Sequence, residues 1–256
     1  MPLNEVHAVL LGILRAVVEA CDRRGVEVFL IGGGCLGMVR HGGFIPWDDD
    51  LDLCIWAADT PAFRAAMAEL PAHLAVRSKA QRRNPSWQVM DTRTRIVGGG
   101  ENDGDSVFID IVPMMHWRSV AAKRLDDVVS WLANTAPART RGRAALKGVL
   151  RLCGVPPVAG WVCDRLLYPM FQRHDRACRA GARGIVSGAY GRRWVGRYDY
   201  DVVFPLRRAT FCGVELLVPN DLHRFLSRRY GKTYMVPLDA PARWRHFQAA
   251  TRIADR

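Results

Sequence analysis

Apolar residues recur along the N-terminal part of the chain at two different spacings. Over residues 4–21 they fall at helical intervals, which predicts an amphipathic helix that packs on the core, with Asn4 as a candidate N-cap. Residues 26–31 form a short run rich in β-branched and aromatic side chains, and glycines follow it, so this run predicts a buried strand. A short helix over residues 36–40 is predicted next.

A second apolar strand is predicted over residues 51–55, directly after a run of carboxylates. Asp50 and Asp52 flank Leu51, and Asp48 has the same parity, so period-2 geometry places these carboxylates on one face. Carboxylates this close repel one another and are costly to bury without a cation. Hard oxygen ligands at this spacing suit Mg²⁺ or Mn²⁺. A solvated acidic turn is the alternative interpretation.

The three glycines between the two predicted strands favour anion binding. Gly32, Gly33 and Gly34 have no Cβ, so their backbone N–H groups can approach a phosphate closely, and the helix that follows favours anions at its N-terminus. Three glycines after a strand also occur as a plain turn. The acidic run that follows shifts the balance toward a phosphate loop facing a metal site.

The next 60 residues predict the rest of a sheet. Thr60 and Pro61 indicate the start of a helix through residue 70, and strands are predicted over residues 87–95 and 106–112. Asp110 is the only charged residue in the second of these strands. An isolated carboxylate there needs a metal or a salt bridge to a nearby arginine.

Three stretches resemble one known family. Residues 40–52 read Arg-His-Gly-Gly-Phe-Ile-Pro-Trp-Asp-Asp-Asp-Leu-Asp, residues 108–113 read FIDIVP, and residues 209–237 carry a hairpin, a helix and an Arg-Tyr-Gly signature. Together they resemble the LicD family, which includes the fukutin-related proteins and belongs to the nucleotidyltransferase superfamily. The resemblance implies an α+β fold, with a nucleotidyltransferase-type mixed sheet flanked by helices and a basic helical insertion.

The resemblance also assigns roles to residues. The metal ligands it implies are Asp48, Asp50, Asp52 and Asp110. Of these, the ones it implies to be catalytic are Asp50, Asp52 and Asp110, the last as candidate base. The substrate- and phosphate-binding residues it implies are Gly32, Gly33, Arg40, His41 and Trp47. The predicted domains are a catalytic core over 1–117, the insertion over 118–205, and a hairpin with helices over 206–256 that complete the core.

Charge and composition indicate the kind of partner. The formal net charge is +12, which favours anionic partners such as nucleotides, polyanionic glycans or anionic lipid surfaces. Residues 139–152 alternate basic and apolar side chains, and an apolar segment follows over 155–171. This region predicts either peripheral contact with an anionic membrane or a helical subdomain with a solvated basic face. Aromatics interleave with arginines over 190–200, which fits either substrate stacking or packing.

Location is predicted from what the sequence lacks. It shows no signal peptide and no apolar run of about 18 residues, and its seven cysteines are an odd number without a C-x-x-C pair. We expect a cytoplasmic protein, with the inner face of the cell membrane as a further site of action.

The leading functional hypothesis follows from the resemblance. It is the Mg²⁺- or Mn²⁺-dependent transfer of a phosphorylated alcohol, such as phosphocholine or an alditol phosphate, from a CDP-activated donor to a hydroxyl of a cell-surface or lipid-linked glycan. A second hypothesis is a nucleotidyltransferase that moves a nucleoside monophosphate from an NTP to protein, RNA or a small molecule. A third is a non-catalytic module that binds RNA or an anionic surface, although a nucleic-acid partner is not favoured.

Overall fold

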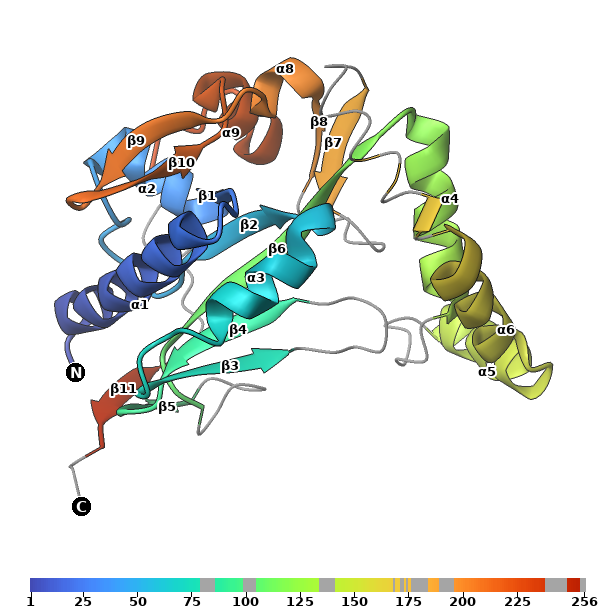
Figure 1. The fold of residues 1–256 in the computed structure, drawn as a ribbon, viewed down its shortest axis with the longest axis horizontal. Helices are drawn as coiled ribbons and strands as arrows, with labels where there is room; N and C mark the ends of the chain where they lie inside the picture. Colours follow the sequence, from blue (N-terminus) through green and yellow to red (C-terminus); the bar gives the residue numbers. More distant parts are fainter. Residues whose placement is uncertain are drawn as a thin grey trace.

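The computed structural model describes residues 1–78, 86–98, 105–133, 141–167, 169–170, 173, 175, 184–188, 196–237 and 248–253 (Figure 1). Its helical elements are α1 (Leu3–Arg23), α2 (Gly32–His41), η1 (Ala57–Asp59), α3 (Thr60–Met67), α4 (Val120–Ala133), α5 (Arg141–Leu152), α6 (Val155–Val162), η3 (Cys163–Leu167), α8 (Tyr200–Val203) and α9 (Leu222–Tyr230). Its strands are β1 (Val28–Leu30), β2 (Asp52–Trp56), β3 (Leu74–Ser78), β4 (Trp87–Asp91), β5 (Thr94–Val97), β6 (Phe108–Trp117), β7 (Ile185–Gly188), β8 (Arg197–Asp199), β9 (Arg207–Phe211), β10 (Val214–Val218) and β11 (Ala249–Arg252).

One mixed sheet organises the fold. Its strands lie in the order β3-β4-β6-β2-β1-β10-β9, with β7 and β8 added beside the distal half of β6. The pairs β2–β6 and β1–β10 are parallel, and the other neighbours are antiparallel. Helices flank this sheet (Figure 1). The predicted α+β class with a mixed sheet flanked by helices is therefore confirmed.

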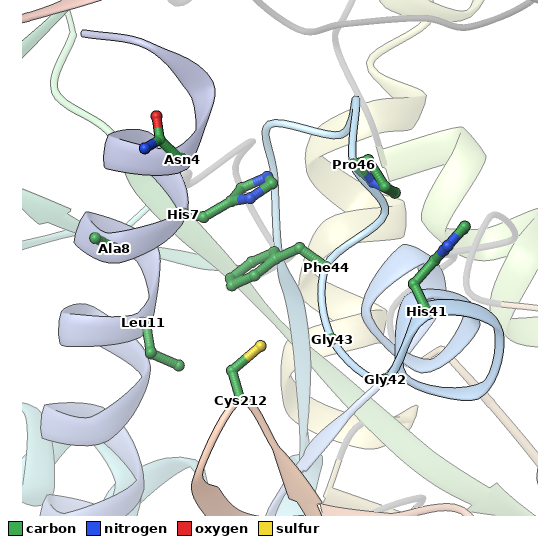
Figure 2. Close-up of a pocket in the computed structure, with 10 residues that line it drawn as sticks. All are labelled: Asn4, His7, Ala8, Leu11, His41, Gly42, Gly43, Phe44, Pro46 and Cys212. Atoms are coloured by element: carbon green, nitrogen blue, oxygen red, sulfur yellow. The ribbon is translucent and has the colours of Figure 1, made fainter.

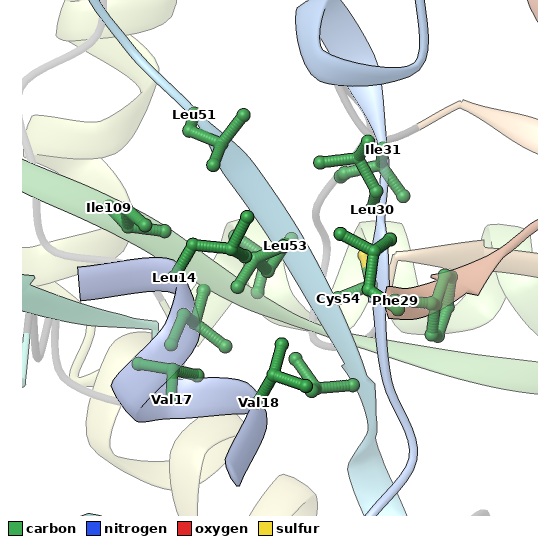
Figure 3. Close-up of a cluster of buried hydrophobic side chains, with 14 of the residues drawn as sticks. Leu14, Val17, Val18, Phe29, Leu30, Ile31, Leu51, Leu53, Cys54 and Ile109 are labelled. Atoms are coloured by element: carbon green, nitrogen blue, oxygen red, sulfur yellow. The ribbon is translucent and has the colours of Figure 1, made fainter. Parts of the chain in front are cut away.

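The core lies between α1 and the centre of the sheet. Leu14, Val17 and Val18 on one side of α1 pack toward Leu53 of β2 and Ile109 of β6 (Figure 3). All five side chains are buried, as the helical spacing of α1 and the strand parity predict. This packing fixes the middle of β2 and β6, and so the strand ends that carry the carboxylates.

Two glycines allow α2 to pack tightly against its surroundings. A Cβ at position 34 would lie 2.5 Å from Leu30 Cδ1, and a Cβ at position 37 would lie 2.3 Å from the carbonyl oxygen of Gly43. Any side chain at either position would push the helix away from β1 or from the loop that follows the helix. The glycines of this stretch therefore serve packing as well as any role in binding.

Two predicted strands differ from the observed ones. The strand predicted over 87–95 is instead β4, a turn and β5, because the side chain of Asp91 accepts the backbone N–H of Arg93 at 3.0 Å and reverses the chain. The strand predicted to end at residue 112 continues as β6 to Trp117. It passes through Pro113 where β6 changes its antiparallel partner from β4 to β7, so the missing N–H breaks no ladder bond on that side.

Two helix starts also differ from prediction. Helix α1 has Pro2 at its N-cap rather than Asn4, and α9 is capped by the Asp221 side chain, which accepts the Arg224 N–H at 2.9 Å. Helix α2 begins at Gly32 itself rather than at residue 36. The glycines are therefore the first turn of the helix and not a loop before it.

Residues from the predicted insertion join the main sheet and also form a helical arm. Strand β7 pairs with β6, while α4, α5 and α6 extend away from the sheet (Figure 1). The carboxylate of Asp175 accepts the backbone N–H of His116 at 2.9 Å and lies 2.7 Å from its Nδ1 atom, with both side chains buried. The domain boundaries stay a prediction, and the sheet crosses them. In the described ranges no helix is long and apolar enough to cross a membrane.

The aromatics predicted either to stack substrate or to pack are partly described. Tyr198 is buried and stacks on Phe225 of α9, with ring centroids 4.3 Å apart, and Tyr200 stacks on Phe204. Both tyrosines therefore pack inside the fold. The Tyr190–Trp194 part of this motif and Arg139 lie outside the described residues.

Candidate functional site

Two carboxylates meet where the parallel strands β2 and β6 begin their pairing. Asp52 and Asp110 are register partners, and both are half-buried. The Asp110 N–H donates to the Leu51 carbonyl at 3.1 Å, and the Ile31 N–H donates to the Asp52 carbonyl at 3.1 Å. The strand ladder therefore fixes the backbone on both sides of this pair. Register partners present their side chains to the same face, so the two carboxylates share one face of the sheet.

The first turn of α2 lies against the acidic residues. A Cβ added to Gly32 would meet Asp52 Oδ2 at 3.0 Å, and one added to Gly33 would meet Asp48 Oδ2 at 2.7 Å. Gly32 also has φ +60°, which L side chains rarely adopt. The first N–H groups of a helix have no acceptor within the helix, and its dipole favours anions there. Glycine at both positions thus brings a helix N-terminus into contact with two of the predicted carboxylates.

The rest of the acidic run follows the predicted alternation. Asp48 and Asp50 are half-buried like Asp52, whereas Asp49 is only 2% exposed. The N–H of Asp49 donates to Asp48 Oδ1 at 3.2 Å, and His7 Nε2 of α1 donates to the Asp48 carbonyl at 2.7 Å. These bonds hold the turn before β2 in place, so three carboxylates of one parity stay on the accessible side.

The predicted phosphate-binding residues at and just after the end of α2 lie in two settings. His41 is exposed and meets the half-buried Trp47 edge-on, with ring centroids 5.8 Å apart. The Arg40 guanidinium donates instead to backbone carbonyls of the C-terminal segment, from Nε to Tyr234 at 2.8 Å and from Nη2 to Val236 at 3.2 Å. These contacts tie α2 to the residues after α9, and a phosphate-binding role for Arg40 stays a prediction.

The donor chemistry fits a divalent cation that is completed by substrate. Across the described ranges, no three His, Cys, Asp or Glu side chains converge as a ready-made metal site. Mg²⁺ is commonly held by one or two carboxylates together with substrate phosphates and water. The Asp52–Asp110 pair supplies two such carboxylates next to a helix N-terminus suited to phosphate. The metal and its ligands stay predictions.

Sequence reasoning did not find Gln88, which lies on the other side of Asp110. Gln88 of β4 is the antiparallel register partner of Asp110 and is 0% exposed. Its Oε1 accepts from Arg77 Nη2 at 2.6 Å, while its Nε2 has no hydrogen-bond partner within the described part of the chain. A glutamine in an apolar strand was the available signal, but only the register shows that it adjoins the carboxylate.

Arg77 brings a positive charge to this edge of the site. Its guanidinium is held by both oxygens of Asp105, at 2.8 and 2.6 Å. The hydrogen bonds that Arg77 donates to Asp105 raise the pKa of Arg77, and the negative charge of Asp110 adds to this effect. The negative charge of Asp110 therefore interacts with the positive charge of Arg77 on β3.

Tyr230 at the end of α9 lies within the electrostatic field of the site. Burial raises its pKa to about 12, and the charge of Asp52 adds to this rise, while Arg229 opposes it. The Tyr230 hydroxyl therefore stays protonated at neutral pH. The signal in the sequence was the Arg-Tyr-Gly signature, which carries no chemistry by itself.

Residues 25–133 match the family described as "LicD/FKTN/FKRP, nucleotidyltransferase domain". This segment contains Gly32, Gly33, the acidic run and Asp110. The chain carries a LicD-family domain.

Named relatives of the LicD family match over a shorter stretch. Over 53 residues the chain is 43% identical to the lipopolysaccharide cholinephosphotransferase LicD of Haemophilus influenzae, which covers 21% of this chain and 20% of that protein. Over 45 residues it is 49% identical to the ribitol 5-phosphate transferases FKRP of Mus musculus and Homo sapiens, which covers 18% of this chain and 9% of each of them. These LicD-family relatives are transferases, and the match spans a fifth or less of their length.

One solved structure was also similar in part. The antibiotic-resistance factor ANT(2'')-Ia aligns over 71% of this chain and 98% of its own, with 13% identity and a TM-score of 0.30. A likeness at that level carries no argument about this chain.

The LicD-family segment does not include every residue near the site. Tyr230 and the carbonyls that hold Arg40 lie outside residues 25–133. A surface pocket of about 630 Å³ also opens behind the acidic turn, between α1 and the loop after α2 (Figure 2). There His7 stacks on Phe44, with ring centroids 4.3 Å apart, and Cys212 closes one side. His7 lines this pocket and also hydrogen-bonds to the Asp48 carbonyl, so the pocket adjoins the turn that carries Asp48.

Proposed function

We propose that this chain transfers a phosphorylated alcohol, phosphocholine or an alditol phosphate, from a CDP-activated donor to a hydroxyl group of a glycan. The observation that carries the proposal is the Asp52–Asp110 register pair beside the glycine turn of α2, inside the LicD-family segment. An anion-binding helix end and paired carboxylates are the two parts that phosphoryl transfer needs for positioning and for charge.

The residues act at two places on the donor and acceptor. The first-turn N–H groups of α2 bind and orient the donor phosphates, and Asp110 accepts the proton of the acceptor hydroxyl. The acceptor oxygen then bonds to the phosphorus next to the alcohol, and the bond from that phosphorus to the CMP oxygen breaks. CMP leaves with the electron pair of the broken bond. Most of the rate enhancement in such reactions comes from positioning and electrostatics.

A divalent cation completes this proposal. Asp52 and Asp110, with Asp48 and Asp50 beside them, would hold Mg²⁺ or Mn²⁺ together with the donor phosphates. When bound, the cation neutralises the negative charge of the phosphates and lowers the pKa of the acceptor hydroxyl.

The relatives support particular classes of donor and acceptor for this proposal. The names of these relatives describe the transfer of phosphocholine to lipopolysaccharide and the transfer of ribitol 5-phosphate. We therefore place CDP-choline and CDP-ribitol first among donors, and a cell-surface or lipid-linked glycan first among acceptors. The described cysteines 21, 35, 54, 153 and 212 are free thiols, and the cytoplasmic location stays a prediction.

A second candidate is a nucleotidyltransferase that moves a nucleoside monophosphate from an NTP. The description of the matching family as a nucleotidyltransferase domain favours it, and the same carboxylates would serve. The two candidates differ in the bond that breaks, so they release different products. An NTP donor gives pyrophosphate, and a CDP-alcohol donor gives CMP.

A thermal-stability panel separates the two without any acceptor. The purified chain would be heated with CDP-choline, CDP-ribitol, CDP-glycerol or each NTP, with and without Mg²⁺. A ligand at about 100 times its dissociation constant adds roughly 2.7 kcal/mol, which raises Tm by a few degrees. We expect a Mg²⁺-dependent rise with a CDP-alcohol that is weaker in Asp52→Asn. A rise with NTPs alone would favour the second candidate, and no rise with any nucleotide would reject both.

A further inference from the structure

The outer helices of the arm, α5 and α6, leave several large apolar side chains exposed. On α5, Lys147 is only 8% exposed, and its Nζ lies 5.5 Å from the ring centroid of Trp131 on α4. Burial lowers the pKa of Lys147. Leu146 and Val149 of the same helix are about half exposed. A helix that packs on a core normally does the reverse.

The exposed apolar surface continues around the end of the arm. Leu152, the last residue of α5, is 91% exposed, and Gly154 turns the chain into α6. Val158 and Trp161 of α6 are also largely exposed, the latter at 58%. These exposed residues all belong to the helix–turn–helix formed by α5 and α6, and we call its residues 149–161 the apolar tip. Exposed Leu and Trp grouped in this way mark an interaction surface.

Positive charge accompanies the apolar tip. The sequence of α5 contains Arg141, Arg143, Lys147 and Arg151 and no acidic residue. Among the residues whose side chains are described, Arg151 at the tip and Arg165 after α6 are exposed. The surface therefore offers apolar side chains together with cations, which complements a partner that is apolar inside and anionic outside.

We propose that the tip formed by residues 149–161 docks onto the surface of an anionic lipid bilayer. Leu152, Val158 and Trp161 enter the boundary between headgroups and acyl chains, while Arg151 contacts anionic headgroups. Trp is suited to this boundary because its ring is apolar and its N–H is polar. The arm projects from the sheet, so its end reaches a bilayer without the catalytic core doing so (Figure 1).

A bilayer fits this tip better than a second copy of the chain does. Two copies meeting through the tip would bring the cations of both copies into an interface to which α5 and α6 supply no acidic residue, and such like charges repel. The described apolar residues also project from a helical end rather than line a groove. A fluid bilayer accepts a projecting end without a matching shape. The proposal deepens the proposed function, because a lipid-linked acceptor lies at a membrane, but it does not depend on the carboxylates.

Vesicle flotation tests the proposal with the full chain. Vesicles of phosphatidylcholine alone would be compared with vesicles that also contain phosphatidylglycerol, at low and high salt. We expect binding to the anionic vesicles only, weakened by salt. Leu152→Ser and Trp161→Ser should each weaken binding by about tenfold or more, because each removes a large apolar side chain that the bilayer would bury. Arg151→Gln should reduce the salt dependence.

Two control variants are compared with the variants of the tip in the vesicle test. Ile253→Ser removes an exposed apolar residue from the C-terminal segment after β11, and Arg15→Gln removes an exposed charge from α1; both should bind vesicles like the unchanged chain. Thermal melts would show that Leu152→Ser is folded. The proposal is overturned if the chain does not float with anionic vesicles or if Leu152→Ser binds as well as the control. It is also overturned if Leu152→Ser dissociates an oligomer, as judged by light scattering, because the tip would then be a subunit interface.

Membrane binding and donor binding should be lost in different variants. Asp52→Asn should lose donor-dependent stabilisation and keep vesicle binding. Leu152→Ser should lose vesicle binding and keep donor-dependent stabilisation. A loss of both in one variant would indicate unfolding, which the melts detect.

Discussion

Asp52 of β2 and Asp110 of β6 face each other directly in the register of two parallel strands. The register continues through Leu53–Ile111 and Cys54–Val112, whose side chains are buried in the core. The backbone of the sheet, and not a loop, therefore sets the spacing of the two carboxylates. A pair held in this way should tolerate loss of charge without loss of fold.

Asp52→Asn and Asp110→Asn should each lower turnover of the CDP-alcohol by at least about a hundredfold, by analogy with the removal of one electrostatic group from an active site. Tm should stay unchanged or rise slightly, because each change relieves repulsion between neighbouring carboxylates. CMP release and thermal melts measure the two effects on the same preparations.

Asp22→Asn is the matched control for this pair, because Asp22 is an exposed carboxylate on α1. It should leave both turnover and Tm unchanged. Full activity in both Asp52→Asn and Asp110→Asn would remove these carboxylates from the chemistry. A large fall in Tm would show instead that the pair is structural.

Gly33→Ala should reduce donor binding with only a modest effect on stability. The new Cβ would lie 2.7 Å from Asp48 Oδ2, so the carboxylate must move away from the first turn of α2. Gly12→Ala in α1 is the control, since a Cβ there meets nothing within 4 Å. That change should stabilise the chain by about 0.5–1 kcal/mol through helix propensity. Urea unfolding and the ligand-induced shift in Tm measure the two quantities. Normal donor binding in Gly33→Ala would contradict the role given to this turn.

The sequence was sufficient for the parts of the site that local periodicity controls. Period-2 alternation predicted that Asp48, Asp50 and Asp52 share parity, and the structure leaves all three half-buried while Asp49 is buried. Asp110 was predicted as a site residue because it is the only charge in an apolar strand, and this prediction did not require the strand register. The mixed sheet followed from the resemblance to the LicD family.

The rest of the site depends on contacts between distant segments. Gln88 adjoins Asp110 only because β4 pairs with β6, and Tyr230 comes from a helix more than 150 residues after Asp52. No pattern in one sequence gives such a register. The strand predicted over 87–95 was wrong for a local reason, because the Asp91 side chain competes for a backbone N–H within an otherwise strand-like run.

Arg40→Ala should lower the free energy of unfolding by about 1–3 kcal/mol, because the guanidinium bonds to the carbonyls of Tyr234 and Val236 would be lost. Urea unfolding measures this, and Arg15→Ala, an exposed arginine on α1, is the control. If stability is unchanged while the donor-induced rise in Tm is lost, Arg40 acts on phosphate as the LicD resemblance implies, and the contacts with the C-terminal segment are secondary.

Acid should destabilise the chain partly through Asp91. Burial by itself raises the pKa of this carboxyl, but hydrogen bonds from the Arg93 side chain and backbone, at 2.6 to 3.0 Å, outweigh it, so the pKa lies below its usual value. A carboxyl with a lowered folded-state pKa contributes stability above its unfolded pKa of about 3.9. That contribution is lost as the pH falls through the folded-state pKa.

Asp91→Asn isolates this contribution. At pH 7 it should cost about 1–3 kcal/mol, because it replaces charge-assisted hydrogen bonds that hold the turn between β4 and β5. As the pH falls from about 4 through the lowered folded-state pKa of Asp91, the difference between the variant and the unchanged chain should shrink toward zero, because Asp91 then becomes protonated as well. Urea unfolding across this pH range measures the difference, with Asp22→Asn as the control for a change in net charge. A difference that stays constant with pH would mean that the turn depends on the shape of the side chain and not on its charge.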